Sequence, residues 1–130
     1  MHEIKRVALI VLLFTSYDAM AEWIEVAGTY DVRTYIDYNS VRKEADFVRA
    51  WEMRSYMKPK ADLIPGVAYQ SVKYLSTYDC KEERIRMISM IFHSESMGKG
   101  EIVWSTHTPG HWIYVSPNSV GKEMLDTVCK

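Results

Sequence analysis

Residues 69–78 (YQSVKYLSTY) and 83–93 (ERIRMISMIFH) are the stretches that decide the fold of this chain. Both are rich in β-branched and aromatic residues, which favour strands. The four residues between them, Asp79-Cys80-Lys81-Glu82, begin with a residue type that often starts a turn. The sequence therefore predicts an antiparallel hairpin that carries Cys80 at its turn.

Further extended segments lie on both sides of this hairpin. They are rich in β-branched and aromatic residues and are separated by turn residues, as in residues 23–29, 32–37, 47–57, 101–106 and 111–115. Met97-Gly98-Lys99-Gly100 predicts a second hairpin turn, because glycine tolerates a positive φ. Residues 58–66 contain two prolines, which resist a central strand position, so a loop is predicted there.

Alternation along residues 47–57 separates two faces of one predicted strand. Phe47, Trp51 and Met53 fall on one face, while Glu52 and Arg54 fall on the other. On this pattern we expect Trp51 and Trp104 to be core residues, because large aromatic side chains stabilise small β domains.

The end of the chain changes to a helical period. Ser116-Pro117 supplies a good N-cap followed by the residue favoured at the first helical position. After it, Val120, Met124 and Val128 recur every four residues and form an apolar face. We therefore predict an α+β fold, an antiparallel sheet of about six strands with this helix packed on it.

The first twenty-one residues have the three parts of an export signal. Lys5 and Arg6 precede an unbroken apolar run at residues 7–14 (VALIVLLF), and Ala19-Met20-Ala21 is a small-x-small cleavage pattern. A membrane span needs about 20 apolar residues, so this run is too short to be an anchor. We expect cleavage after Ala21 and a mature domain that begins at Glu22.

Two cysteines, Cys80 and Cys129, fall in the predicted mature domain of residues 22–130. Exported proteins with two cysteines usually pair them, and Cys129 on the helix could reach Cys80 at the hairpin turn. Closing so long a loop contributes roughly 4 kcal/mol in the chain-entropy model. The alternative is a pair of metal-binding or reactive thiols, but no CxxC spacing supports it.

The net charge of the chain and its predicted location restrict the partners that it can bind. The chain has 16 Lys and Arg against 17 Asp and Glu, a net charge of −1. This balance gives no broad positive field for nucleic acid or anionic lipid. Because no lipid-attachment cysteine stands at the predicted cleavage point, we expect a periplasmic or secreted protein without a membrane anchor.

No motif for catalysis is present. The sequence has no GxSxG elbow, and the two cysteines are assigned to the disulfide. His93, His107 and His111 are the histidines of the predicted domain, and a small hydrolase or metal-binding protein built on them is one hypothesis. Thr108-Pro109-Gly110 prevents a regular helical metal site, so we expect loop histidines and no enzyme, metal or cofactor.

Several segments, in this order along the chain, resemble the surface-adhesin protein E family of Gram-negative bacteria. They are residues 35–37, 40–41, 48–53, 71–73, 78–80, 84–87, 97–100, Trp112, Pro117, 119–120 and Cys129. The resemblance implies an antiparallel sheet of about six strands, a C-terminal helix and a Cys80–Cys129 disulfide. It also implies binding to host extracellular-matrix proteins and a possible homodimer.

Arginine and tyrosine give the candidate binding surface, because this combination is typical of protein-binding surfaces. The candidates are Arg49, Arg54, Tyr56, Tyr74, Arg84 and Arg86. The simpler interpretation is an ordinary solvated sheet face. The leading hypothesis is a non-enzymatic protein-binding module, and the alternative is a structural or accessory envelope protein, acting as an oligomer.

Overall fold

The structure is a computed structural model that describes residues 21–130. The predicted export signal at residues 1–21 falls almost entirely outside the described residues. That signal and its cleavage before Glu22 therefore stay predictions.

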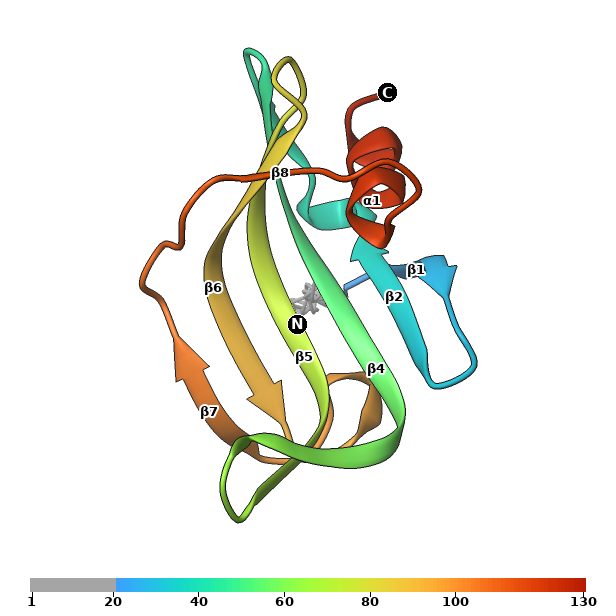
Figure 1. Ribbon diagram of the computed structural model, residues 1–130, viewed down its shortest axis with the longest axis vertical. Helices are drawn as coiled ribbons and strands as arrows, with labels where there is room; N and C mark the ends of the chain where they lie inside the picture. Colours follow the sequence, from blue (N-terminus) through green and yellow to red (C-terminus); the bar gives the residue numbers. More distant parts are fainter. Residues whose placement is uncertain (1–20) are drawn as a thin grey trace, which may run out of the picture.

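Eight strands form one antiparallel sheet, drawn in Figure 1. The strands are β1 (Trp23–Gly28), β2 (Val32–Asp37), β3 (Arg42–Glu44), β4 (Phe47–Ile64), β5 (Val67–Asp79), β6 (Arg84–His93), β7 (Ile102–Thr106) and β8 (Ile113–Tyr114). Six of them follow the order β1-β2-β4-β5-β6-β7, while β3 pairs with β4 and β8 pairs with β6. The short 3-10 turns η1 (Tyr38–Ser40) and η2 (Ser96–Gly98) and one helix, α1 (Val120–Val128), complete the fold.

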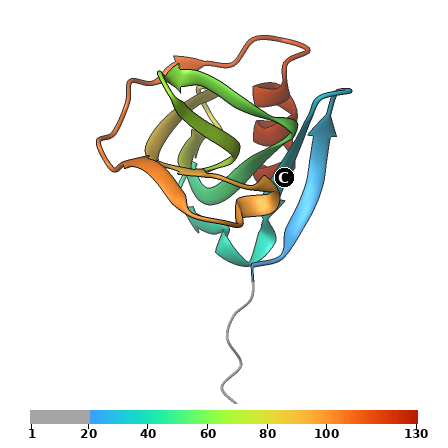
Figure 2. The ribbon, with the colours of Figure 1, turned by 90° about the horizontal axis from the view of Figure 1, so that it is seen from below.

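The predicted central hairpin is confirmed. Strands β5 and β6 pair from Asp79 opposite Arg84 to Ser71 opposite His93, and Cys80 lies in the turn. One bulge interrupts this ladder next to Leu75. Figure 2 shows that the long strands curl, so that α1 lies on the inner side of a curved sheet.

Helix α1 closes the inner face of the sheet. Its buried residues Met124, Leu125 and Val128 share one hydrophobic cluster with sheet residues that include Val48 and Ala50. The helix begins later than predicted, because Ser119 is the N-cap and its hydroxyl accepts from the Lys122 N–H at 3.1 Å. The residue before it, Asn118, has a positive φ of 57°, which keeps residues 116–118 out of the helix.

The predicted disulfide is present between Cys80 and Cys129, whose Cα atoms are 5.7 Å apart. It links the β5–β6 turn to the C-terminal end of α1. The Cys80 N–H also donates to the Asp46 carbonyl oxygen at 3.0 Å, which ties this turn to the neighbouring β3–β4 turn. The α+β fold with one disulfide is therefore confirmed.

The expectation about tryptophan was wrong. Val48 and Ala50 face the helix, whereas Trp51 is half-buried on the opposite, outer face, and Trp104 on edge strand β7 is 38% exposed. Small side chains such as Ala50 and Ser76 allow a helix to approach the sheet closely. Alternation alone does not show which face the helix will choose.

The loop predicted for residues 58–66 is also wrong. Strand β4 continues through Pro59 to Ile64, and only residues 65 and 66 form the turn. The register with β5 shifts between Ser55 and Lys60, and such irregular edges tolerate proline. Leu63, near the tip of this hairpin, and Trp104 of β7 line the same small hollow.

Removal of the Cys80–Cys129 disulfide tests how much this bond contributes to the stability of the fold. Replacing both Cys80 and Cys129 by alanine removes the link across a 49-residue separation, so the free energy of unfolding should fall by about 2–4 kcal/mol. Urea denaturation of the variant and of the oxidised protein measures this difference. The reduced native sequence is the matched control and should behave like the variant; an unchanged midpoint would contradict the stabilising role of the disulfide.

Candidate binding surface

The structure divides the six candidate residues among three places. Arg49, Arg84 and Arg86 project from the outer face, because the register places each in the same alternation as Phe47. Arg54 falls on the opposite, inner face, where its guanidinium lies over the Tyr74 ring, 5.4 Å from the centroid. The sixth candidate, Tyr56, lies near the middle of β4, and its ring packs against that of Tyr69 with 5.9 Å between the centroids. The six residues therefore do not form one continuous surface.

On the outer face, Arg84 holds a small aromatic cluster together. Its Nε donates to Asp79 Oδ2 at 2.8 Å, and its guanidinium lies 4.6 Å from the centroid of the Trp112 ring. The Trp112 ring in turn packs against Phe47, with 5.9 Å between the centroids. Burial raises the pKa of Asp79, but hydrogen bonds from Arg84 and from backbone N–H groups outweigh it and hold that pKa below its usual value.

On the inner face, the carboxyl group of Glu52 is buried next to the part of the sheet on which the helix packs. Glu52 is 7% exposed, and one of its oxygens accepts from Ser76 Oγ at 2.8 Å. The Tyr78 hydroxyl lies beside the same carboxyl without a well-formed hydrogen bond. Burial raises the pKa of Glu52, although the Ser76 hydrogen bond and the charge of Arg54 oppose the rise.

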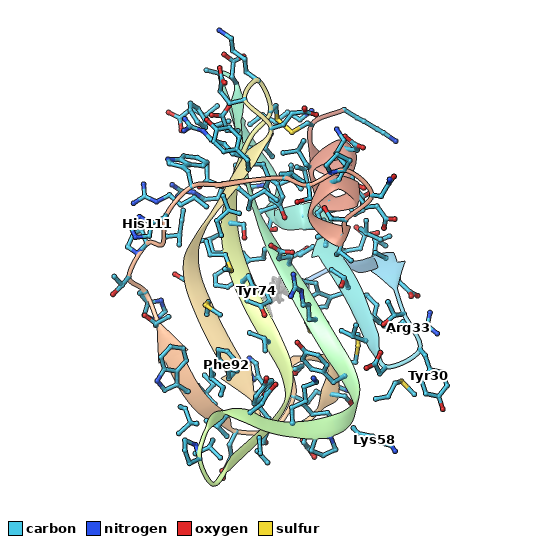
Figure 3. The ribbon with its side chains drawn as sticks, viewed as in Figure 1. Tyr30, Arg33, Lys58, Tyr74, Phe92 and His111 are labelled. Carbon is cyan, nitrogen blue, oxygen red and sulfur yellow. A yellow bond between two sulfur atoms is a disulfide. The ribbon has the colours of Figure 1, made fainter. Side chains whose placement is uncertain are left out.

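Tyr74 and Phe92 belong to one buried cluster, and Figure 3 shows Tyr74 near the centre of the molecule with Phe92 below it. Burial raises the pKa of Tyr74 to about 12, so its hydroxyl stays neutral at physiological pH. A chain of ring contacts runs from Tyr56 through Tyr69 and Phe92 to Trp104, with centroids 4.9–5.9 Å apart. These aromatic rings pack against one another and do not form an open site.

The three histidines are not brought together. His93 is buried on β6, and neither of its ring nitrogens has a hydrogen-bond partner among residues 21–130. His107 Nδ1 lies 3.1 Å from Ser89 Oγ, and His111 is exposed at the side of the molecule in Figure 3. Within the described part of the chain, no group of three His, Cys, Asp or Glu side chains is placed to hold a metal ion.

Sequence reasoning missed a groove at the end of the β1–β2 hairpin. Its volume is about 630 Å³, and it is lined by Tyr30, Asp31, Tyr56, Met57, Lys58, Pro59 and Lys60. Tyr30 is 98% exposed and Met57 is 64% exposed. Figure 3 shows Tyr30 and Lys58 at the same end of the molecule. The available signal was a large aromatic residue in the turn between two predicted strands.

This groove has defined walls because backbone hydrogen bonds hold both sides. The Thr29 N–H donates to the Val32 carbonyl oxygen at 2.8 Å, which closes the turn that carries Tyr30. The Met57 N–H donates to the Asp31 carbonyl oxygen at 2.9 Å and joins the turn to β4. Beyond Met57, β4 has no strand on its β2 side, so the groove opens along a free edge.

These features define a class: a small α+β domain with one curled antiparallel sheet and a C-terminal helix fastened by a single disulfide. No helix within residues 21–130 has the length and apolar character needed to cross a membrane. The family model described as Surface-adhesin protein E matches residues 23–130. The chain belongs to this family of surface adhesins, so the resemblance noted in the sequence is confirmed.

Solved structures of protein E from Haemophilus influenzae are similar to this chain. The selenomethionine form has a TM-score of 0.65 at 15% identity, covering 86% of this chain and 88% of that one. Crystal form II gives 0.65 at 16% identity, with 86% and 90% covered. The protein from a non-typeable strain gives 0.56 at 15% identity, with 87% and 78% covered. Likeness at this identity shows a shared fold. A comparison with curated protein sequences finds no match.

Replacing Glu52 by glutamine should stabilise the protein at neutral pH. The folded-state pKa of Glu52 is raised, so its contribution is favourable below the unfolded value near 4.5 and is lost as pH rises. Urea denaturation at pH 4 and pH 7.5 should show a gain for E52Q only at the higher pH. The same substitution at exposed Glu101 is the control; equal effects of the two variants would contradict this assignment.

His93 should make the protein acid-sensitive. Burial and then the nearby charge of Lys73 lower its folded-state pKa, so stability is complete above the unfolded value of about 6.5 and falls as pH decreases below it. Unfolding midpoints measured from pH 7.5 to pH 5 should drop less for H93Q than for the native protein. H111Q, at an exposed site, should keep the native pH profile.

Proposed function

We propose that this protein is an exported, non-enzymatic module that binds a protein partner through the groove between the β1–β2 turn and β4. Membership of the surface-adhesin family supports binding as the activity. The observation that carries the choice of site is the 98% exposure of Tyr30 beside a groove of about 630 Å³. Such side chains are the usual anchors of protein interfaces.

The residues of the groove suit a protein ligand. Met57 is flexible and exposed, and it can adapt its shape to an apolar partner. The ammonium group of Lys60 lies over the Tyr56 ring, 4.9 Å from its centroid, in a cation–π contact. This contact places a positive charge beside an aromatic ring in the groove. Lys58 adds a second exposed cation, while Asp31 on the opposite wall keeps the local charge mixed.

The proposed partner is a host extracellular-matrix protein or a protein of the bacterial envelope, and the proposed location is the periplasm or the extracellular space. A mature N-terminus at Glu22 is part of this proposal. The backbone N–H of Glu22 donates to Asp37 Oδ1 at 3.0 Å, so a chain that begins there remains tied to the sheet.

Substitution in the groove tests the proposed site. The double variant Y30A/M57A removes the two large hydrophobic side chains that the groove exposes most. The affinity for the matrix or envelope protein should fall at least tenfold, with little change in the stability of the fold. Binding of purified matrix proteins to immobilised protein measures the loss. Tyr38→Ala, an exposed tyrosine outside the groove, is the matched control; an equal loss for that control would contradict the site.

A second candidate function is a structural or accessory envelope protein that acts as an oligomer. Strands β1 and β7 lie at the two ends of the main strand order, and β7 exposes Ile102 and Trp104. Exposed edges of this kind pair readily with other strands. Sedimentation velocity at micromolar concentration separates the two proposals, because a monomer argues against the structural role.

A further inference from the structure

Three arginines are aligned across the outer face of the sheet. Arg42 of β3 lies directly opposite Arg49 of β4, Arg49 lies opposite Thr77 of β5, and Thr77 lies opposite Arg86 of β6. Residues opposite one another on neighbouring strands point to the same face. We call Arg42, Arg49 and Arg86 the arginine row.

None of these three arginines forms an ion pair with a carboxylate within residues 21–130. Elsewhere on the sheet, Arg33 pairs with Glu25 at 2.8 Å and Arg84 pairs with Asp79 at 2.8 Å. Like charges placed directly opposite in a sheet are destabilising, so the Arg42–Arg49 pair lowers stability. Packing supplies no compensation at Arg49, which is exposed.

Hydrogen bonds hold the two ends of the row in place. Arg42 Nη1 donates to the carbonyl oxygens of Asn39 and Val41, both at 2.9 Å. At the other end, Arg86 Nε donates to the Gly110 carbonyl oxygen at 2.8 Å. All three contacts end on neutral backbone acceptors, so the positive charge of the row is not neutralised.

A hollow of about 280 Å³ opens beside the row. It is lined by Arg42, Lys43, Glu44, Phe47, Arg49 and Thr77. Lys43 is a further cation in this hollow, although its Nζ donates to the Lys130 carbonyl oxygen at 2.6 Å. Glu44 is the one carboxylate among the lining residues, and it forms no ion pair within the described chain. Positive charge therefore exceeds negative charge in the hollow.

We propose that the arginine row binds a linear sulfated polysaccharide, with one sulfate group in the hollow between Arg42 and Arg49 and another at Arg86. Guanidinium groups bind tetrahedral oxyanions through two parallel hydrogen bonds. Neighbouring strands are about 4.8 Å apart, so the row offers repeated positive charges across the sheet. The arginine row runs across the strands on the outer face of the sheet. It is away from the strand edges, where an extended peptide would pair as a further strand.

The net charge of −1 separates this ligand from nucleic acid. A nucleic-acid surface needs a broad positive potential, whereas this chain offers one short row. The Thr77 hydroxyl, between Arg49 and Arg86, supplies a neutral donor at the centre of the row. A chain with spaced sulfate groups and neutral hydroxyls between them matches this order of side chains.

Titration with a size-defined heparin oligosaccharide tests the proposal on the full predicted mature chain. Isothermal titration calorimetry at 150 mM NaCl should give binding that weakens at least tenfold in Arg49→Glu and partly in Arg49→Lys, because lysine keeps the charge but loses the two-pronged contact. Arg33→Gln is the matched control, since that arginine pairs with Glu25, and it should bind like the native protein. Circular dichroism confirms that each variant is folded.

Three results would overturn the proposal: no binding of heparin, equal binding by Arg49→Glu, or equal affinity for chemically desulfated heparin. Tighter binding of polyglutamate than of heparin would also overturn it, in favour of an acidic protein. The groove variant Y30A/M57A should keep the native heparin affinity. The arginine row and the proposed protein-binding groove can therefore fail separately.

Discussion

The packing of α1 on the inner face is the constraint on which the rest of the structure depends. A curled sheet with one apolar side needs a second layer, and in the described chain this layer is nine residues of helix. Helices this short are marginal by themselves, so contact with the sheet must hold the helix in place. The Cys80–Cys129 disulfide keeps the helix next to the sheet, because it joins the helix end to the turn of the central hairpin.

Because the helix covers part of the inner face, the two proposed binding surfaces lie on the outer face and at the end of a hairpin. The arginine row lies on the outer face, and the groove lies where β2 stops and β4 continues. The arginine row projects from paired strands, and a backbone hydrogen bond from Met57 to Asp31 holds the two walls of the groove together. Such pre-organisation reduces the entropy lost on binding. The two proposed ligands would therefore contact different surfaces of one small domain.

Periodicity and turn residues predicted much of this fold from the sequence. The central hairpin and the helical face at Met124 follow from local patterns that the tertiary structure preserves, whereas the cysteine pair followed from the predicted export and the presence of two cysteines. The face of β4 that packs on the helix was not predictable in this way, since Ala50 is a weak signal beside Trp51. The groove was missed because the pairing of β2 with β4, which places Tyr30 and Met57 at one groove, joins residues far apart in sequence. The arginine row needed the register, which no single strand reveals.

The position of Cys129 near the C-terminal end of the described chain has a consequence for how the protein matures. Its sulfur reaches Cys80 only after the strands and the helix between them have been synthesised, so the covalent closure follows the synthesis of residues 81–128. Until then, the apolar inner face near Val48 lacks its cover and is open to chaperones and proteases. Formation of this one bond therefore requires that strands β6 to β8 and helix α1 have been synthesised and have folded together.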